Sequence, residues 1–283
     1  MQKNNSHWSA PAKLNLFLYI NGRRPDGYHE LQTLFQFVDI GDQLAITPNH
    51  SDSITITPAI PGVPLTDNII YQAAIMLKAY SSLPLGADIN LTKNLPMGGG
   101  LGGGSSDAAT TLVALNQLWQ LHLTEDQLAE IGVKLGADVP VFVRGHAAFA
   151  EGIGEKITPI EVDENYYLIA IPDTQVNTAK LFSDPELIRD TPKRPLNQLL
   201  RDEWKNDFEA TVKKRHPEVA KALEWLLKCA PSRLTGSGCC VFSEFKTKSA
   251  ALAVLAKAPK DMQIYLAKGL NKSPLLDDLA RQV

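Results

Sequence analysis

The sequence predicts a mixed α and β protein, built either as two domains or as one large unit. The chain has 283 residues, more than the ~100–200 residues of a usual domain. Hydrophobic residues make up 44% and charged residues 21%, which fits a soluble globule with a sizeable core. Alternating stretches are interleaved with stretches of helical spacing, so both strands and helices are expected.

The first half begins with a strand that carries two polar side chains on one face. In residues 12–20 the apolar residues alternate with Lys13 and Asn15, so both polar groups point the same way. Asp67 is expected to cap a helix over residues 68–80. The other predicted elements are strands at 34–40, 52–58 and 86–93 and a helix at 108–119.

The second half begins with the most clearly bounded helix. Thr124 and Gln127 form a capping box, and Gly136 ends the helix. Residues 139–143 and 146–152 are expected to be extended. The rest reads as a strand at 166–172, a loop or linker at 184–197, a helix at 216–229, a loop and strand at 234–245, a helix at 249–258 and a strand at 262–269.

Charge and cysteine content narrow the classes of protein. The net charge of −3 favours neither a nucleic acid nor an anionic membrane surface as partner. Cys229, Cys239 and Cys240 match no disulfide framework or zinc pattern. No apolar run reaches the ~20 residues of a membrane span, and the first 13 residues have no signal-peptide core. A cytoplasmic protein without an obligate protein partner is expected.

Residues 95–107, LPMGGGLGGGSSD, contain the most informative pattern. Glycine lets a ligand approach the main chain, and a helix N-terminus presents unpaired N–H groups that bind phosphate. A strand precedes this run, and Ser105, Ser106 and Asp107 are expected to cap the helix that follows. A polyphosphate on bare backbone is therefore expected, with a flexible loop as the alternative.

Other nucleotide-binding patterns fit less well. A Walker A loop ends in Gly-Lys-Ser/Thr, whereas this run ends in Gly-Ser-Ser. A Rossmann fold needs an acid about 20 residues further on, where Trp119, Gln120 and Leu121 stand. The protein-kinase tripeptides His-Arg-Asp and Asp-Phe-Gly are absent from the sequence.

Three segments together resemble the motifs of the GHMP small-molecule kinases. They are PAKLNLFLYINGRRPDGYHEL, LPMGGGLGGGSSDAA and LTGSGCCVF, in the family's order and spacing. The resemblance implies an α+β fold with a ribosomal-protein-S5-like N-terminal domain, residues 1–158, and a ferredoxin-like C-terminal domain, residues 159–283. It also implies transfer of phosphate from ATP to the 2-hydroxyl of 4-diphosphocytidyl-2-C-methyl-D-erythritol, a step of the non-mevalonate route to isoprenoid precursors.

The resemblance also implies roles for single residues. Asp138 is the expected general base, against the alternative of a turn carboxylate, and Lys13 the residue that stabilises charge. Asn15 orients Asp138 or the hydroxyl. Around the substrate, Tyr28 and Phe182 stack on cytosine, His29 bonds to it, and Thr178 contacts the phosphates or tetraol. For Phe182 the alternative is a core aromatic.

ATP and Mg²⁺ are the expected cofactors. Asn68 is expected at adenine and Lys93 beside ATP, although a solvated lysine is an alternative. The metal is expected to be carried mainly by ATP, with Ser106 as a protein ligand. The predicted ATP-binding residues are Asn68, Lys93, Pro96, Met97, Gly98, Gly99, Gly100, Leu101, Gly102, Gly103, Gly104, Ser105, Ser106, Gly236 and Ser237.

Three alternative functions stay open from the sequence. A GHMP kinase of the homoserine or mevalonate type would need no nucleobase pocket. A nucleotide-binding protein without catalysis would not need both Lys13 and Asp138. An RNA-binding module is disfavoured because acids such as Asp202 and Glu209 are interspersed in the basic segment 189–215.

Overall fold

A computed structural model describes residues 6–282, and two long strands organise it. The prediction that no signal segment occupies the first 13 residues falls partly on residues 1–5, outside the described part. The strands are β1 (Ser6–Arg23), β2 (His29–Asn49), β3 (Ile54–Thr57), β4 (Gly86–Thr92), β5 (Ala148–Gly152), β6 (Lys156–Pro159), β7 (Tyr166–Ile171), β8 (Ser232–Leu234), β9 (Val241–Phe245) and β10 (Gln263–Leu270).

The helices are mostly short, and a single 3₁₀ turn, η1 (Leu65–Asp67), precedes the first of them. They are α1 (Ile69–Lys78), α2 (Gly103–Leu118), α3 (Glu125–Leu135), α4 (Val139–Arg144), α5 (Thr178–Phe182), α6 (Leu196–Leu199), α7 (Glu209–Arg215), α8 (Pro217–Leu227), α9 (Lys248–Leu255) and α10 (Pro274–Gln282).

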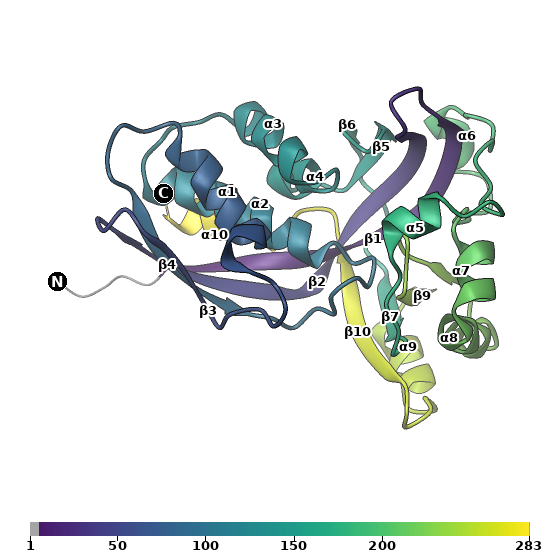
Figure 1. Ribbon diagram of the computed structural model, residues 1–283. Coiled ribbons are helices and arrows are strands. Elements are labelled where there is room, and N and C mark those ends of the chain that lie inside the picture. Colours follow the sequence, from purple (N-terminus) through teal and green to yellow (C-terminus); the bar gives the residue numbers. More distant parts are fainter. Residues whose placement is uncertain (1–5, 283) are drawn as a thin grey trace.

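The sheet runs through both lobes of the molecule (Figure 1). Its order is β3-β4-β2-β10-β7-β9-β8, with β1 and β5 also paired to β2. β1 and β2 pair antiparallel along nearly their whole length, with register shifts on either side of Lys13–Asn15. At these shifts β1 turns its backbone groups toward neighbouring loops, which is how the strand gathers the site.

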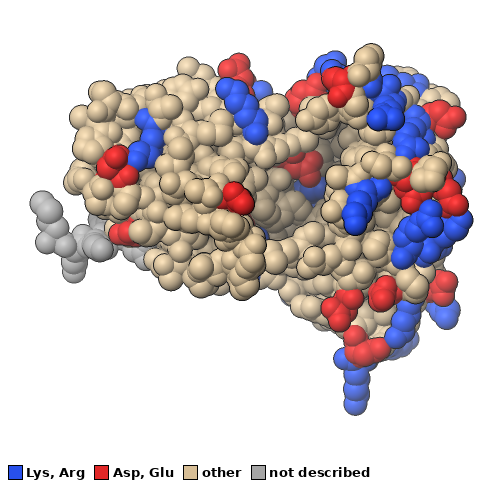
Figure 2. Space-filling view, viewed as in Figure 1, with Lys and Arg blue, Asp and Glu red and all other residues tan. Residues whose placement is uncertain are grey.

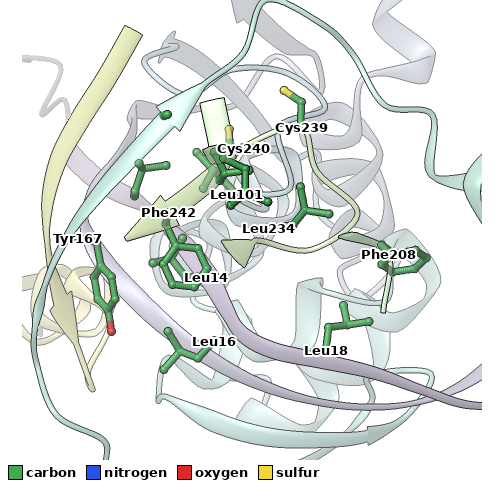
Figure 3. Packing of buried hydrophobic residues seen from close by; sticks show 14 of the residues in the cluster. Leu14, Leu16, Leu18, Leu101, Tyr167, Phe208, Leu234, Cys239, Cys240 and Phe242 are labelled. Carbon is green, nitrogen blue, oxygen red and sulfur yellow. The ribbon is translucent and has the colours of Figure 1, made fainter. Parts of the chain in front are cut away.

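Two apolar cores lie under the two lobes. Helices α1, α2, α3, α4 and α10 surround the core of the first lobe, around Trp8, Phe37 and Phe142. The second core lies between β1, β7, β9 and the helices near α8, and Figure 3 shows Leu14, Leu16 and Phe242 within it. Both faces of β1 are therefore buried along residues 12–20.

The chain returns to its first lobe at the end. Leu275 of α10 is fully buried in the core of the first lobe, and Asp278 accepts a 2.6 Å hydrogen bond from the backbone N–H of Ser9. The predicted boundary between residues 158 and 159 stays a prediction. Among residues 6–282, no helix is long and apolar enough to cross a membrane.

Most predicted elements are confirmed, and the capping box of Thr124 and Gln127 is present. The extended segment predicted for residues 139–143 is wrong, because these residues form α4. Asp138 occupies its N-cap and Pro140 its first turn, where a missing N–H costs nothing. Five consecutive buried residues fit a strand or a buried helix equally well, so the pattern could not separate them.

Candidate active site

A cavity of about 1070 Å³ lies between the two lobes. It is visible as the hollow near the centre of Figure 2. Its walls contain every predicted site residue except Ser106. Segments that lie far apart in the sequence, from Lys13 to Ser237, therefore meet in one space.

The glycine run forms a loop that leads directly into α2. This helix begins at Gly103, so the predicted capping by Ser105, Ser106 and Asp107 is wrong. Gly102, at φ +74°, is the N-cap and supplies no side-chain hydrogen bond. The first backbone bond of the helix runs from the N–H of Ser106 to the carbonyl of Gly102. Within the described chain, the N–H groups of residues 103–105 have no recorded partner and remain available to an anion.

The other two motifs hold this loop in place. The N–H of Lys13 donates to the carbonyl of Leu101 at 3.0 Å, and the N–H of Cys240 donates to the carbonyl of Gly99 at 3.1 Å. Gly100 has a φ of +77°, and a Cβ built there would lie 2.3 Å from the carbonyl oxygen of Thr235. Glycine is thus required at position 100 for both conformation and space.

Lys13 and Asp138 form an ion pair in the cavity wall. The Nζ of Lys13 lies 3.1 Å from Oδ2 of Asp138 and 2.5 Å from Oδ1 of Asn15. The side chain of Lys13 is 3% exposed, whereas that of Asp138 is 35% exposed. Asn15 is itself held by its amide, which donates to the hydroxyl of Thr33. The carboxylate therefore reaches the cavity while the lysine is fixed behind it.

A second lysine joins two carboxylates beside the start of α2. The Nζ of Lys93 lies 2.5 Å from Oδ2 of Asp42 and 2.8 Å from Oδ2 of Asp107. Asp42 also accepts hydrogen bonds from the N–H groups of Asn94 and Leu95. Burial raises the pKa of Asp107 to about 7, because Lys93 offsets only part of the desolvation and Asp42 adds like charge. Lys93 is thus paired rather than freely solvated.

Aromatic side chains line the opposite end of the cavity. The rings of His29 and Phe182 stack with centroids 4.6 Å apart and planes at 19°, and Phe182 packs edge-on against Phe208. Burial lowers the pKa of His29, which keeps its imidazole neutral near pH 7. Tyr28 is 61% exposed. The hydroxyl of Thr178 lies 2.7 Å from that of Ser237, so it connects α5 to the third motif.

Two predicted residues occupy positions that the sequence did not indicate. Asn68, rather than Asp67, is the N-cap of α1, and its Oδ1 accepts from the N–H of Ile70. Ser106 is fully buried, does not line the cavity, and its Oγ has no hydrogen-bond partner among residues 6–282. The structure therefore does not bring Ser106 to the cavity wall, because α2 begins earlier than predicted and turns this residue inward.

The sequence analysis missed several residues in or beside the cavity. Arg23 lines the cavity at the end of β1, and Asp42 of β2 lies beside it, paired with Lys93; nothing in their spacing marks either residue. Arg189 belongs to a segment predicted to be a linker or a solvated surface. Other basic residues of that segment do lie in exposed ion pairs, such as Lys214 with Glu186. Among the described residues, no group of three or more His, Cys, Asp or Glu side chains is arranged to hold a metal ion.

Comparison with known proteins identifies the family of this chain. Two family models match, GHMP kinases N terminal domain over residues 68–146 and GHMP kinases C terminal over residues 186–264. The relatives include the 4-diphosphocytidyl-2-C-methyl-D-erythritol kinases of Tolumonas auensis and of Vibrio cholerae. Each is 58% identical over 96% of this chain, which corresponds to 95% and 94% of the relative.

Solved structures have a similar fold. A crystal structure of 4-(cytidine 5'-diphospho)-2C-methyl-D-erythritol kinase is 30% identical, with a TM-score of 0.78 over 93% of this chain and 98% of the other. A mevalonate kinase with a TM-score of 0.67 is 17% identical over 94% and 99% of the two chains, and shares the fold alone. The predicted two-domain α+β fold is confirmed, and the chain belongs to the GHMP kinase family.

Proposed function

We propose that this kinase transfers the γ-phosphoryl group of ATP to the 2-hydroxyl of 4-diphosphocytidyl-2-C-methyl-D-erythritol. The observation that carries the proposal is the 58% identity, along nearly the whole chain, to kinases named for this substrate. The cavity supports it, because the glycine loop, the Lys13–Asp138 pair and the aromatic pocket lie in one space.

On the ATP side, the phosphates would lie against the N–H groups of residues 103–105, at the positive end of the α2 dipole. Mg²⁺ would be carried by ATP as part of the substrate and would offset phosphate charge there. Asn68 and Lys93, at the edge of the loop, would contact the adenosine. The predicted role of Ser106 as a metal ligand stays a prediction.

The Lys13–Asp138 pair supplies the chemistry at the hydroxyl. Asp138 accepts the hydroxyl proton as the acceptor oxygen attacks the γ-phosphorus and ADP leaves. Lys13, held by Asn15, orients Asp138 through their ion pair and stabilises negative charge that develops on the transferring group. Positioning by this fixed pair matters because phosphoryl transfer needs little covalent chemistry from the protein.

The aromatic pocket would bind the cytosine. Phe182 offers a ring face, Tyr28 is free to close over the base, and neutral His29 can donate or accept one hydrogen bond. Thr178 lies between this pocket and the third motif, where the substrate's phosphates or tetraol would pass. The cytoplasmic location and the absence of nucleic-acid, membrane or protein partners stay predictions.

Release of ADP from ATP, measured with each acceptor alcohol separately, tests the proposal. The account predicts turnover with 4-diphosphocytidyl-2-C-methyl-D-erythritol and little with homoserine or mevalonate, which have no base for the pocket. Turnover with homoserine or mevalonate alone would favour the alternative GHMP activities. No turnover with any acceptor, combined with normal ATP binding, would favour a non-catalytic nucleotide-binding protein.

A further inference from the structure

The basic side chains that line the cavity differ in whether a carboxylate pairs with them. Four basic side chains line it: Lys13, Arg23, Lys93 and Arg189. Both lysines form the ion pairs described above, whereas in the described chain neither arginine has a carboxylate within ion-pair distance. The uncompensated positive charge therefore lies entirely on the two arginines.

Arg189 is fixed in place by neutral groups. Its guanidinium donates to the carbonyl oxygens of Leu187 at 2.9 Å, Phe182 at 2.8 Å and Asp184 at 2.5 Å. Carbonyl oxygens orient the guanidinium of this half-buried side chain without pairing its charge. Three of its five N–H donors are used in these bonds, which leaves Nε and one Nη1 hydrogen for a ligand.

Arg23, the last residue of β1, lines the same cavity. It is the cross-strand partner of His29 in the β1–β2 pair. The ring of His29 stacks on Phe182, whose carbonyl Arg189 binds. Both arginine charges also act on His29, where they lower the pKa of the imidazole in addition to the effect of burial. Arg23, His29, Phe182 and Arg189 therefore form one continuous wall of the cavity. Figure 2 shows many Lys and Arg side chains on the right-hand lobe.

We propose that Arg23 and Arg189 bind the diphosphate of the acceptor substrate, so that the pocket selects a cytidine diphosphate over an uncharged cytidine. This inference rests on the proposed function, because it assumes that the pocket holds a cytidine compound. Guanidinium groups match phosphate oxygens in geometry and charge, and an oriented one binds with less loss of entropy.

Two nearby arginines provide matched controls. Arg24, next to Arg23, is already paired with Asp26 and Glu30. Arg215 binds Asp184 and Glu186, in the same loop that Arg189 organises, but it does not line the cavity. The substitutions Arg24→Gln and Arg215→Gln therefore remove a guanidinium from each segment without removing charge from the wall.

The test is calorimetric binding of CDP and of cytidine, with a non-hydrolysable ATP analogue present at saturation to fill the ATP side. The wild-type protein is expected to bind CDP more tightly than cytidine. Arg189→Gln should weaken the binding of CDP roughly tenfold or more and leave the affinity for cytidine unchanged. Arg23→Gln should have the same effect. The two control variants should match the wild type for both ligands.

Equal weakening of CDP and cytidine by Arg189→Gln would show that this arginine only supports Phe182, and would overturn the proposal. Equal binding of both ligands by the wild-type protein would overturn it as well, while leaving the proposed function intact. If neither ligand binds the wild-type protein, the proposed function fails together with it. If Arg189→Gln does not fold, the proposal is tested with Arg23→Gln and with the salt dependence of binding to the wild-type protein. The affinity for CDP should fall as the salt concentration rises, whereas the affinity for cytidine should not.

Discussion

The two ends of the cavity present different kinds of groups to a ligand. At the α2 end the wall is main chain, and the charged side chains beside it, Lys93, Asp42 and Asp107, pair with one another. At the His29 end the wall is made of rings and of two arginines that have no carboxylate within ion-pair distance among the described residues. Ligand binding at the first end should therefore be weakened by substitutions that add a side chain to the loop. Binding at the second end should be weakened by substitutions that remove a ring or a charge.

The Lys13–Asp138 pair lies between these ends, and its loss should have the largest effect on turnover. Asp138→Asn removes the proton acceptor and keeps the shape of the side chain. We predict that turnover falls by ~10²–10⁴ while ATP affinity stays near normal. Steady-state rates and ATP titration measure the two quantities. Asp126→Asn, at an exposed surface pair with Arg144, is the control; near-normal turnover in Asp138→Asn would exclude Asp138 as the base.

The main-chain end can be tested by adding one methyl group. Gly100 and Gly98 have φ values of +77° and +70°, so alanine costs each a similar left-handed strain. Only at Gly100 does the new Cβ meet backbone, whereas at Gly98 nothing lies within 4 Å. We predict that Gly100→Ala loses roughly 1–3 kcal/mol more stability than Gly98→Ala, and more ATP affinity. Equal losses in thermal unfolding and ATP binding would show that the contact with Thr235 is unimportant.

The side-chain end can be tested by removing a ring. Tyr28→Ala should raise the KM for the cytidine substrate by an amount equivalent to roughly 1–3 kcal/mol, the contribution of one stacked base. The KM for ATP and the melting temperature should hardly change, since Tyr28 is 61% exposed. Tyr80→Ala, 50% exposed and away from the cavity, is the control. A similar rise in both KM values would place Tyr28 outside the cytosine pocket.

The last prediction concerns stability alone, at the paired charges of the α2 end. The pKa of Asp107 is about 7 in the folded protein, above its ordinary 3.8, so folding favours the protonated form. This carboxyl therefore contributes most stability below pH ~4, and the contribution is lost as pH rises to about 7. We predict that Asp107→Asn gains stability relative to the wild type between pH 5 and pH 7.5 in denaturant unfolding. A difference that is constant with pH would contradict this.

The same contrast explains what the sequence could reveal. The main-chain end is specified by the absence of side chains, which leaves a visible run of glycines from Gly98 to Gly104. Lys13 and Asn15 could be paired because a strand places them on one face. The resemblance to the family motifs predicted that Asp138 shares a site with Lys13 and Asn15, although more than 120 residues separate these positions.

The other end is built by tertiary packing, and local patterns do not record it. Arg189 reaches the cavity only because three carbonyls of its own loop hold it there, and its segment resembles an exposed linker. The burial of Asp107 was missed because a residue of its type after glycine and serine is also typical of a helix cap. Residues 139–143 were assigned wrongly because a short buried run has no decisive period.

A crystal structure with a non-hydrolysable ATP analogue tests the central claim, that the α2 N-terminus holds the phosphates opposite the Lys13–Asp138 pair. The account predicts phosphate oxygens within hydrogen-bond distance of the N–H groups of residues 103–105, with the γ-phosphate on the side facing Asp138. A triphosphate bound elsewhere, or turned away from Asp138, would contradict it.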